Sequence, residues 1–397
     1  MARPILYAGA LLLLTTLPGV AASPKWVVHA INGKSEFEAA GVFDVDGDGK
    51  LDIVSGDTWY QSPGWTASKV REVTKQGTYF NDFATLPMDV NGDSKIDFVT
   101  CAYFPKNVGW VENPGEKGKE WTYHEIDLPG TSEAAVLVDL NRDGKPDVLP
   151  NVTGRVVWYE LLEAGPTPKW KKHDFGTEAA GHGVGSGDVN GDGRIDLLTP
   201  KGWFEGPEDP KAETWAWHPE WNLGATGIQI LARDIDGDGL ADLVHGMGHN
   251  YGLFWSKQIK GSDGKRSWER KDIDLSVASV HTLLWADLDG DGHEELVTGK
   301  RVYAHEVEAG ATDGSVVSTY AFDRKSGQWN RSILFQGQPA TKAPAGPQRN
   351  AQKDFPPGTV GTGLQMTAID IDVDGDIDLV CPGKSGLYLL ENMSKSK

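Results

Sequence analysis

The apolar positions of this chain fall into short runs between polar turns, and no helical period extends along it. Runs such as residues 51–54 and 195–198 are only four residues long and are bounded by Gly or Pro. Short apolar runs between turn residues are typical of β-strands. The pattern therefore predicts an all-β protein.

An acidic nine-residue motif recurs seven times between these strands. Its copies begin at Asp44, Asp89, Asp139, Asp188, Asp234, Asp287 and Asp370. The starts are 45, 50, 49, 46, 53 and 83 residues apart. Repeats at a spacing of about 20 to 50 residues indicate a stacked or circular array of identical units.

Each copy has an oxygen-bearing side chain at its positions 1, 3, 5 and 9. These residues are Asp44, Asp46, Asp48 and Asp52; Asp89, Asn91, Asp93 and Asp97; Asp139, Asn141, Asp143 and Asp147; Asp188, Asn190, Asp192 and Asp196; Asp234, Asp236, Asp238 and Asp242; Asp287, Asp289, Asp291 and Glu295; Asp370, Asp372, Asp374 and Asp378. Oxygen ligands at this density favour Ca²⁺ over Mg²⁺ or Mn²⁺. We therefore predict up to seven structural calcium ions.

An EF-hand does not fit these loops. Position 12 of the first copy is Ser55, where an EF-hand needs a bidentate Glu, and the flanking segments are predicted strands. A tight acidic turn between two strands is the alternative. The ions would then hold turns in place, and no catalytic role is expected for them.

Each repeat contains four predicted strands. A strand of small residues precedes the acidic motif, an apolar strand follows it, and an aromatic strand and a Trp-led strand complete the unit, as in 136–138, 148–150, 157–159 and 170–175. Four short strands per repeat predict a seven-bladed β-propeller of four-stranded blades. One Trp-led strand, 26–31, precedes the first motif, so we expect the N-terminal strand to complete the last blade and close the ring.

The ends and the two longest connections stand outside this regular pattern. Residues 1–22 have the features of a cleaved signal peptide, with Arg3, an apolar run and small residues at 20–22. The chain from 23 to 397 is predicted to be a single propeller with insertions near 302–314 and 336–362. No segment has the ~20 apolar residues of a membrane span. We expect a secreted or periplasmic protein, and the pairing of Cys101 with Cys381 is left open.

The net charge of −19 is concentrated in the acidic motifs, which hold close to half of the 57 acidic residues. One divalent ion per motif would cancel most of that charge. No basic stripe is present, so nucleic acid is not an expected partner. A carbohydrate or another small polar ligand fits better.

Residues suited to acid–base chemistry are expected on the face opposite the acidic motifs, because alternate connections of a blade emerge on opposite faces. The candidate catalytic residues are His182, His245, His249, Tyr251, His281, Lys300 and Arg301, and the candidate substrate-binding residues are Trp203, Trp255, Tyr303 and His305. They come from repeats 4 to 6, and both insertions belong to this face. The histidines are also a candidate site for one transition metal ion or Mg²⁺. Turn capping by the histidines and packing by the tryptophans are the alternatives.

The repeated DxDGDGxxD-type motif resembles the FG-GAP/VCBS repeat family, which implies the calcium-loaded propeller fold of integrin α subunits. The segment 180–301 resembles the propeller domain of aldos-2-ulose dehydratase. The residues that carry this resemblance are GHGVGSGDVNGDGRIDLLTPKGWFEGPEDP, HGMGHNYGLFW and HTLLWADLDGDGHEELVTGKR. That resemblance implies elimination of water from a keto-sugar. Ulvan-cutting polysaccharide lyases are similar in using His and Tyr on a seven-bladed propeller.

The function predicted on these grounds is that of a secreted C–O lyase or dehydratase of keto-sugars, working by β-elimination. One of the histidines at 182, 245 and 281 would remove the proton, and Tyr251 or another His would protonate the leaving oxygen. Lys300, Arg301 or a bound metal would stabilise the enolate. A non-catalytic glycan- or protein-binding propeller, similar to that of integrins, and a purely structural assembly protein are the alternatives.

Overall fold

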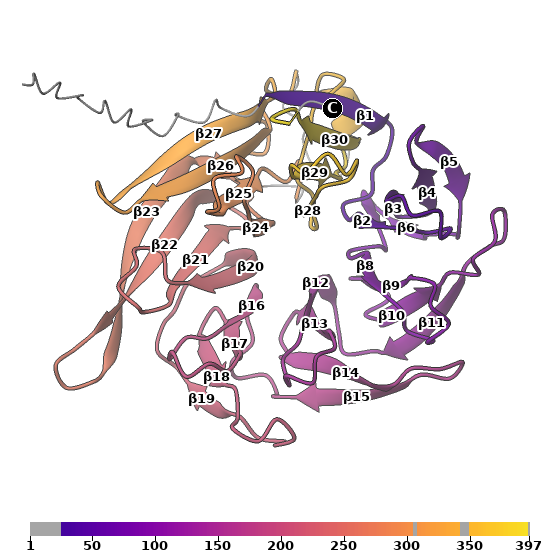
Figure 1. Ribbon diagram of the computed structural model, residues 1–397. Coiled ribbons are helices and arrows are strands. Elements are labelled where there is room, and N and C mark those ends of the chain that lie inside the picture. The colour runs from indigo at the N-terminus through magenta and orange to yellow at the C-terminus, as the bar shows by residue number, and fades with distance from the viewer. Residues whose placement is uncertain (1–24, 305–307, 342–348, 396–397) are drawn as a thin grey trace, which may run out of the picture.

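The chain forms an all-β ring with a β-propeller arrangement (Figure 1). This computed structural model describes residues 25–304, 308–341 and 349–395. The predicted signal peptide at 1–22 and His305 lie outside the described residues. We number the repeats 1 to 7 in the order of their acidic motifs, which we call the acidic loops.

Repeats 1, 2, 3 and 6 each form one four-stranded antiparallel sheet. Repeat 1 contains β2 (Gly41–Phe43), β3 (Asp52–Ser55), β4 (Thr58–Gln61) and β5 (Thr66–Lys69); repeat 2 contains β8 (Leu86–Met88), β9 (Asp97–Cys101), β10 (Val108–Glu112) and β11 (Thr122–Asp127); repeat 3 contains β12 (Ser132–Val138), β13 (Asp147–Val152), β14 (Val157–Glu163) and β15 (Lys169–Asp174); repeat 6 contains β24 (Leu283–Ala286), β25 (Glu295–Gly299), β26 (Val316–Asp323) and β27 (Gln328–Gln336). A small hairpin of β6 (Lys75–Gln76) and β7 (Tyr79–Phe80) lies between repeats 1 and 2.

Repeats 4 and 5 share one eight-stranded sheet. Its members are β16 (Val184–Gly187), β17 (Asp196–Thr199), β18 (Gly202–Glu205), β19 (Ala216–His218), β20 (Thr226–Arg233), β21 (Asp242–Met247), β22 (Tyr251–Lys260) and β23 (Arg266–Ala278). Parallel pairing of β16 with β20 joins the two halves. Besides the β6–β7 hairpin, the described residues therefore form five four-stranded sheets and one of eight strands, so a count of seven separate blades is not confirmed.

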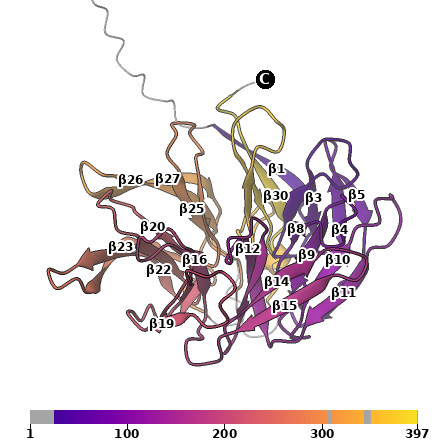
Figure 2. The same cartoon turned by 60° about the horizontal axis from the view of Figure 1, so that its bottom comes forward.

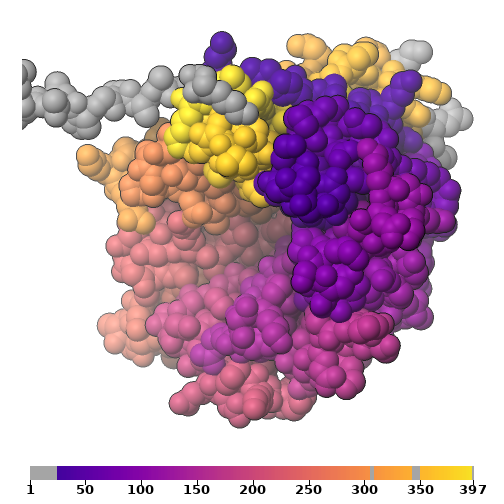
Figure 3. All heavy atoms as spheres, turned by 45° about the vertical axis from the view of Figure 1, so that its right-hand side comes forward, coloured from indigo at the N-terminus to yellow at the C-terminus, as the bar shows by residue number. Residues whose placement is uncertain are grey.

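The two ends of the chain meet in repeat 7. Strand β1 (Trp26–Asn32) pairs antiparallel with β30 (Leu387–Asn392), which continues through β29 (Asp378–Cys381) to β28 (Thr367–Ile369). Figure 3 shows the yellow C-terminal residues packed beside the indigo N-terminal ones. The prediction that the N-terminal strand closes the ring is confirmed, and this closure leaves no open sheet edge between the first and last repeats.

The first strand of every repeat lies toward the centre of the ring and the last strand toward its periphery (Figure 1). Each acidic loop connects a first strand to a second strand, as predicted. Viewed from the side, the β22–β23 and β26–β27 hairpins project from the ring (Figure 2). The predicted aromatic strands are all present, each buried against its neighbours.

The core is a set of hydrophobic clusters between neighbouring sheets, with Trp158 and Trp203 among the largest fully buried side chains. Cys101 and Cys381 are both buried and free. The only helix of the described ranges, α1 (Ala351–Asp354), is one turn long, so no helix there could cross a bilayer. Because the hydrophobic clusters lie between neighbouring sheets, the centre of the ring is the place where repeats 1 to 7 all meet.

Candidate functional site at the channel mouth

One position of the repeat faces the centre of the ring in all seven copies. It lies six residues before each acidic loop, either just before the first strand or within its first three residues, and so at the end that is farthest from the loop. The residues there are Glu38, Phe83, Glu133, His182, Ile228, His281 and Leu364. The three apolar members share one hydrophobic cluster. The four ionisable members occupy the same level of the channel, on the face opposite the acidic loops.

A second position, fourteen residues after each loop begins, reaches the same end of the ring because it follows the second strand. It supplies Tyr103, Arg301 and Lys384. The next residue along is Phe104 in repeat 2 and His249 in repeat 5. We call this end of the ring the channel mouth. It is formed by two positions of the repeat, and each position carries a different residue from one repeat to the next.

Arg301 links three repeats across the channel. It is completely buried, with Nε and Nη2 donating to the carboxylate of Glu38 at 2.7 and 3.1 Å and Nη1 donating to Glu133 at 2.6 Å. Burial would raise the pKa of Glu133, but Arg301 and His182 outweigh it and hold that pKa well below its ordinary value. The charge of Arg301 is thus balanced by Glu38 and Glu133, an arrangement that favours a role in positioning the two carboxylates, and a direct catalytic role for Arg301 stays a prediction.

His182 is held as a double hydrogen-bond donor. Its Nδ1 lies 2.6 Å from the carbonyl oxygen of Thr226, and its Nε2 lies 3.1 Å from the Glu133 carboxylate. Both partners are acceptors, which requires a proton on each ring nitrogen. Burial alone would lower the pKa of His182, but the hydrogen bond and charge of Glu133 offset it and raise the pKa. This imidazole is therefore suited to donate a proton.

Two further imidazoles pack against His182 and favour the neutral form. The ring centroid of His249 lies 4.8 Å from that of His182, and the centroid of His281 lies 5.9 Å from it. Burial and the charge of His182 lower the pKa of His249. Burial and Arg301 hold the pKa of His281 well below its ordinary value. Of these two rings, His249 is the more accessible, since it is half-buried whereas His281 is fully buried.

The same three histidines are a candidate metal site, since one ring nitrogen of each lies within 4.8 Å of the others. Three imidazoles suit Zn²⁺ or a similar ion. The fit is incomplete, however, because both nitrogens of His182 already face oxygen acceptors. A metal could bind there only if His182 gave up one of these hydrogen bonds.

An aromatic wall faces the ionisable groups. A cavity of about 170 Å³ is lined by Tyr79, Phe83, Tyr103 and Phe104 on one side and by Glu133 on the other. The rings of Tyr79 and Phe104 are 5.9 Å apart, and the ammonium group of Lys384 lies 3.8 Å from the centre of the Tyr79 ring. Burial lowers the pKa of Lys384 to about 8. The aromatic residues come from repeat 2 and from the β6–β7 hairpin, which the sequence pattern did not single out.

The backbone is unusual beside the site residues. A β-bulge between Ser132 and Ala135 turns Glu133 into the channel, and Ala134 has a positive φ of 68°. Ser279 and Tyr303, two residues from His281 and Arg301, have φ values of 56° and 53°. Conformations of this kind cost energy for residues other than Gly and concentrate at functional sites.

Lys300 and Tyr251 are engaged with the repeat-6 insertion. The Lys300 ammonium donates to the carbonyl oxygens of Gly310, Ala311 and Asp313, the last two at 3.4 and 2.7 Å. The Tyr251 hydroxyl donates to the Asp313 carboxylate at 2.5 Å. Lys300 thus organises the insertion instead of facing the imidazoles, and a role for Tyr251 as general acid stays a prediction.

The other predicted residues are also placed away from the histidine cluster. His245 is fully buried beside Phe254, and burial lowers its pKa to about 4. Trp203 is fully buried and stacks on His218 at 4.2 Å. Tyr303 is buried against Phe355. The geometry favours packing for these three side chains, whereas Trp255 lines a different cavity described below.

The expectation that repeats 4 to 6 hold the whole site is incomplete. Glu38 comes from repeat 1, Glu133 from repeat 3 and Lys384 from repeat 7. The signal that could have found them is the register: Glu38-Ala39-Ala40 and Glu133-Ala134-Ala135 stand at the same distance before their loops as His182 and His281.

In the acidic loops, carboxylates at positions 1, 3 and 5 converge. Four loops bring three carboxylate oxygens within 4.8 Å of one another: those of Asp44, Asp46 and Asp48; of Asp234, Asp236 and Asp238; of Asp287, Asp289 and Asp291; and of Asp370, Asp372 and Asp374. The carboxylate at position 9 of each loop has a different structural role. The Asp97 carboxylate, for example, accepts backbone N–H groups of Val90 and Asn113 at 3.1 and 2.8 Å. It therefore ties the loop to the end of the aromatic strand.

Comparison with known proteins supports this repeat architecture. A family model of FG-GAP-like repeats matches residues 89–149, which include two acidic loops. The chain carries an FG-GAP-like repeat. The FG-GAP resemblance is thereby confirmed, while the narrower resemblance to aldos-2-ulose dehydratase stays a prediction.

No curated protein matches this FG-GAP-repeat chain in sequence. Among solved structures, it is similar to rhamnogalacturonan lyase YesW, with 16% identity and a TM-score of 0.46 over 91% of this chain and 75% of the lyase. It is also similar to an Agrocybe aegerita lectin that recognises non-reducing terminal N-acetylglucosamine. The identity is 15% and the TM-score 0.48 over 92% of this chain and 91% of the lectin. A third similar structure is BBS1N in its complex with ARL6DN, with 11% identity and a TM-score of 0.49 over 94% of this chain and 98% of BBS1N. Similarity this low says nothing about ligands.

The pairing of His182 with Glu133 gives a direct prediction. In Glu133→Gln the pKa of His182 should fall by about one unit or more, because the charged hydrogen-bond partner that raises it is gone. Histidine NMR titration would measure this change. The matched control is Glu160→Gln, which removes the carboxylate that pairs with His173 in repeat 3 at 3.0 Å. A His182 pKa that moves equally in both variants, or in neither, would contradict the assignment.

Proposed function

We propose that the channel mouth is an acid–base site at which a carbohydrate substrate loses a C–O bond by β-elimination. The arrangement that supports the proposal is a group of adjacent imidazoles in different surroundings. His182 faces oxygen acceptors at both ring nitrogens, which raises its pKa, while burial lowers the pKa of His249 and His281, whose ring centroids lie 4.8 and 5.9 Å away. Neighbouring titratable groups whose pKa values are pushed apart are the arrangement used for paired acid and base roles.

His249 is the base in this proposal because its pKa is lowered, which favours the neutral ring, and because it is more accessible than His281. It removes a proton from the carbon next to a carbonyl group, and the electron pair of that C–H bond becomes the new C=C bond. The C–O bond at the β carbon then breaks, and His182 delivers its proton to the leaving oxygen. His281, fully buried, supports the other two rings.

The charge of the cluster favours such a reaction. With His182 protonated, the positive groups His182, Arg301 and Lys384 lie among the carboxylates of Glu38, Glu133 and Glu308. Positive groups in a partly buried site stabilise the negative charge that develops on the carbonyl oxygen. Lys384 lies against the Tyr79 ring, which lines the cavity.

The cavity itself favours a small substrate unit. Its volume of about 170 Å³ is below the ~300 to 1,000 Å³ usual for larger ligands, so it suits one sugar ring. The aromatic wall offers flat apolar faces to the C–H face of a sugar, and Glu133, with the tyrosine hydroxyls, offers partners to its hydroxyl groups. The segment 180–301, with its resemblance to a keto-sugar dehydratase propeller, is consistent with this class of substrate. A glycan-binding propeller without turnover is the second candidate.

The roles of the histidines can be tested with conservative variants. His182→Gln and His249→Gln should each lower turnover of 2-keto or 3-keto sugars by about 10²-fold to 10⁴-fold, the usual contribution of a general acid or base. Formation of the unsaturated product would be followed by absorbance and mass spectrometry.

His124→Gln is the matched control, because His124 stacks on Trp110 in an outer strand of repeat 2. It should leave turnover unchanged. Full activity in both channel variants, at an unchanged melting temperature, would exclude the acid–base proposal. Glycan binding by wild type without any product would favour the second candidate.

We also propose that the acidic loops bind calcium. The carboxylates at positions 1, 3 and 5 would hold each ion, since four loops gather three of them within 4.8 Å. In the other three loops position 3 is Asn91, Asn141 or Asn190, whose side-chain oxygen can replace a carboxylate. Bound calcium would neutralise charges that otherwise repel one another inside a short turn.

Calcium removal should therefore destabilise the protein. An ion that binds only the native state adds about 2.7 kcal/mol when present at a hundred times its Kd. We expect excess EDTA to lower the melting temperature, and added Ca²⁺ to restore it. Asp46→Asn with Asp48→Asn should reduce the calcium-dependent part of the shift. A melt that is the same with EDTA and with Ca²⁺, after prolonged chelation, would argue against filled loops.

Finally, we infer that repeats 4 and 5 are two blades merged at their inner strands, which makes the ring seven-bladed. The support is that each half of the eight-stranded sheet is a four-stranded antiparallel meander like the other repeats. A crystal structure in which these eight strands do not divide into two such units would overturn this inference.

A further inference from the structure

A second cavity lies away from the channel mouth, between repeats 5 and 6. Its volume is about 530 Å³, and its lining comes from the β22–β23 hairpin, the β26–β27 hairpin and Asp236 of the repeat-5 acidic loop. Because it includes a residue of an acidic loop, it opens on the side of the ring opposite the histidines. We propose that this cavity is a second carbohydrate site, one that binds a neutral saccharide without turnover.

The cavity exists because repeats 5 and 6 have unusually long outer hairpins. Strands β22 and β23 have 10 and 13 residues, whereas β18 and β19 in the other half of the same sheet have 4 and 3. Strands β26 and β27 have 8 and 9. The two hairpins project from the ring together (Figure 2). Residues of both hairpins line the cavity.

Repeat 5 also departs from a packing pattern shared by repeats 2, 3 and 4. In those repeats a His of the outer strand stacks on the Trp paired with it: His124 on Trp110, His173 on Trp158 and His218 on Trp203, with ring centroids 4.3, 3.6 and 4.2 Å apart. In repeat 5 the paired residues are Lys271 and Trp255. A flexible ammonium side chain, 5.1 Å from the ring centre, replaces the flat imidazole cover.

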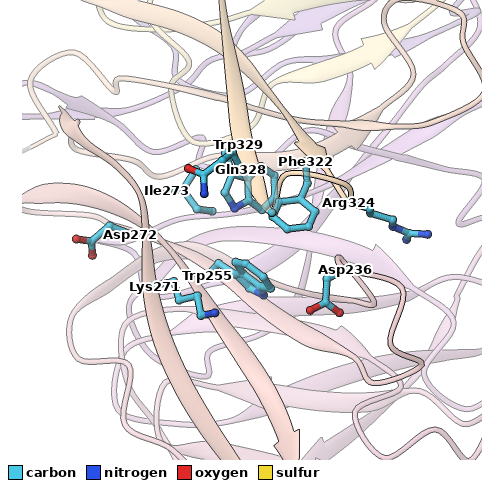
Figure 4. A pocket seen from close by; sticks show the side chains of 10 residues that line it. Asp236, Trp255, Lys271, Asp272, Ile273, Phe322, Arg324, Gln328 and Trp329 are labelled. Carbon is cyan, nitrogen blue, oxygen red and sulfur yellow. The ribbon is translucent and has the colours of Figure 1, made fainter.

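The aromatic part of the lining consists of Trp255, Phe322 and Trp329 (Figure 4). The Phe322 ring lies 5.0 Å from Trp255 and 5.2 Å from Trp329. The three side chains come from two hairpins. Trp255 is buried, and the half-buried Phe322 and Trp329 supply the accessible apolar surface of the cavity. Aromatic faces of this kind pack against the C–H face of a pyranose ring.

The polar part of the lining carries charges of both signs. Lys271 and Arg324 lie with Asp272 and with Asp236, which also belongs to a loop proposed to bind calcium, and Gln328 adds an uncharged amide. Figure 4 shows Lys271 and Asp272 on one side of the aromatic group and Asp236 and Arg324 on the other. Donors and acceptors surrounding aromatic faces fit a ligand that is flat, uncharged and rich in hydroxyl groups. A phosphate-bearing or strongly acidic ligand would need an excess of basic groups, which this cavity lacks.

The test begins with a glycan array of neutral oligosaccharides, followed by isothermal titration with the strongest binder. Lys271→His should restore the stacked cover seen in repeats 2 to 4 and weaken binding at least tenfold, with an unchanged melting temperature. Gln328→Ala, at an exposed position, should weaken binding without filling the cavity. Lys169→Ala, on the exposed outer strand of repeat 3, is the matched control and should bind like wild type.

The channel variant His182→Gln separates this site from the proposed catalytic one. It should bind the neutral saccharide as wild type does, and Lys271→His should retain turnover of small keto-sugars. Loss of saccharide binding in His182→Gln with full binding in Lys271→His would overturn the proposal, as would failure of the wild-type protein to bind any neutral glycan. Neither result would decide whether the channel mouth is catalytic, which depends on turnover alone.

Discussion

A buried guanidinium group has to be neutralised, and in this protein its partners lie on other repeats. Arg301 of repeat 6 is completely buried between Glu38 of repeat 1 and Glu133 of repeat 3. A buried charge without its partners costs several kcal/mol. The ion pairs can form only when the ring is closed, so ring closure and assembly of the channel mouth are one event. Closure in turn depends on β1 pairing with β30.

The same ion pairs determine the chemistry around them. Because Arg301 fixes Glu133, that carboxylate stays ionised despite its burial and can hold His182 in the protonated form. The positive charge of Arg301 and His182 in turn helps to keep the neighbouring His281 and His249 neutral. One structural ion-pair network thus shifts the pKa values of neighbouring histidines in opposite directions.

Much of this architecture follows from sequence patterns that have a direct physical cause. The acidic loops, the aromatic strands and the closing role of residues 26–31 depend on local pattern and on counting strands. The orientation of single side chains does not. Lys300 and Arg301 are neighbours in sequence, yet Lys300 binds the carbonyl oxygens of the repeat-6 insertion while Arg301 enters the channel. Glu38 and Glu133 were missed because each stands in a run of small apolar residues, and only alignment of the repeats reveals that they share a register with His182.

Proton removal next to a carbonyl group is the step on which the functional account depends, and it can be measured without knowing the leaving group. Keto-sugars incubated with the protein in D₂O would be examined by NMR for deuterium at the carbon beside the carbonyl. The account predicts protein-dependent exchange or elimination with at least one keto-sugar, and its loss in His249→Gln. Exchange no faster than in buffer across a panel of 2-keto and 3-keto sugars, with no elimination product, would contradict it.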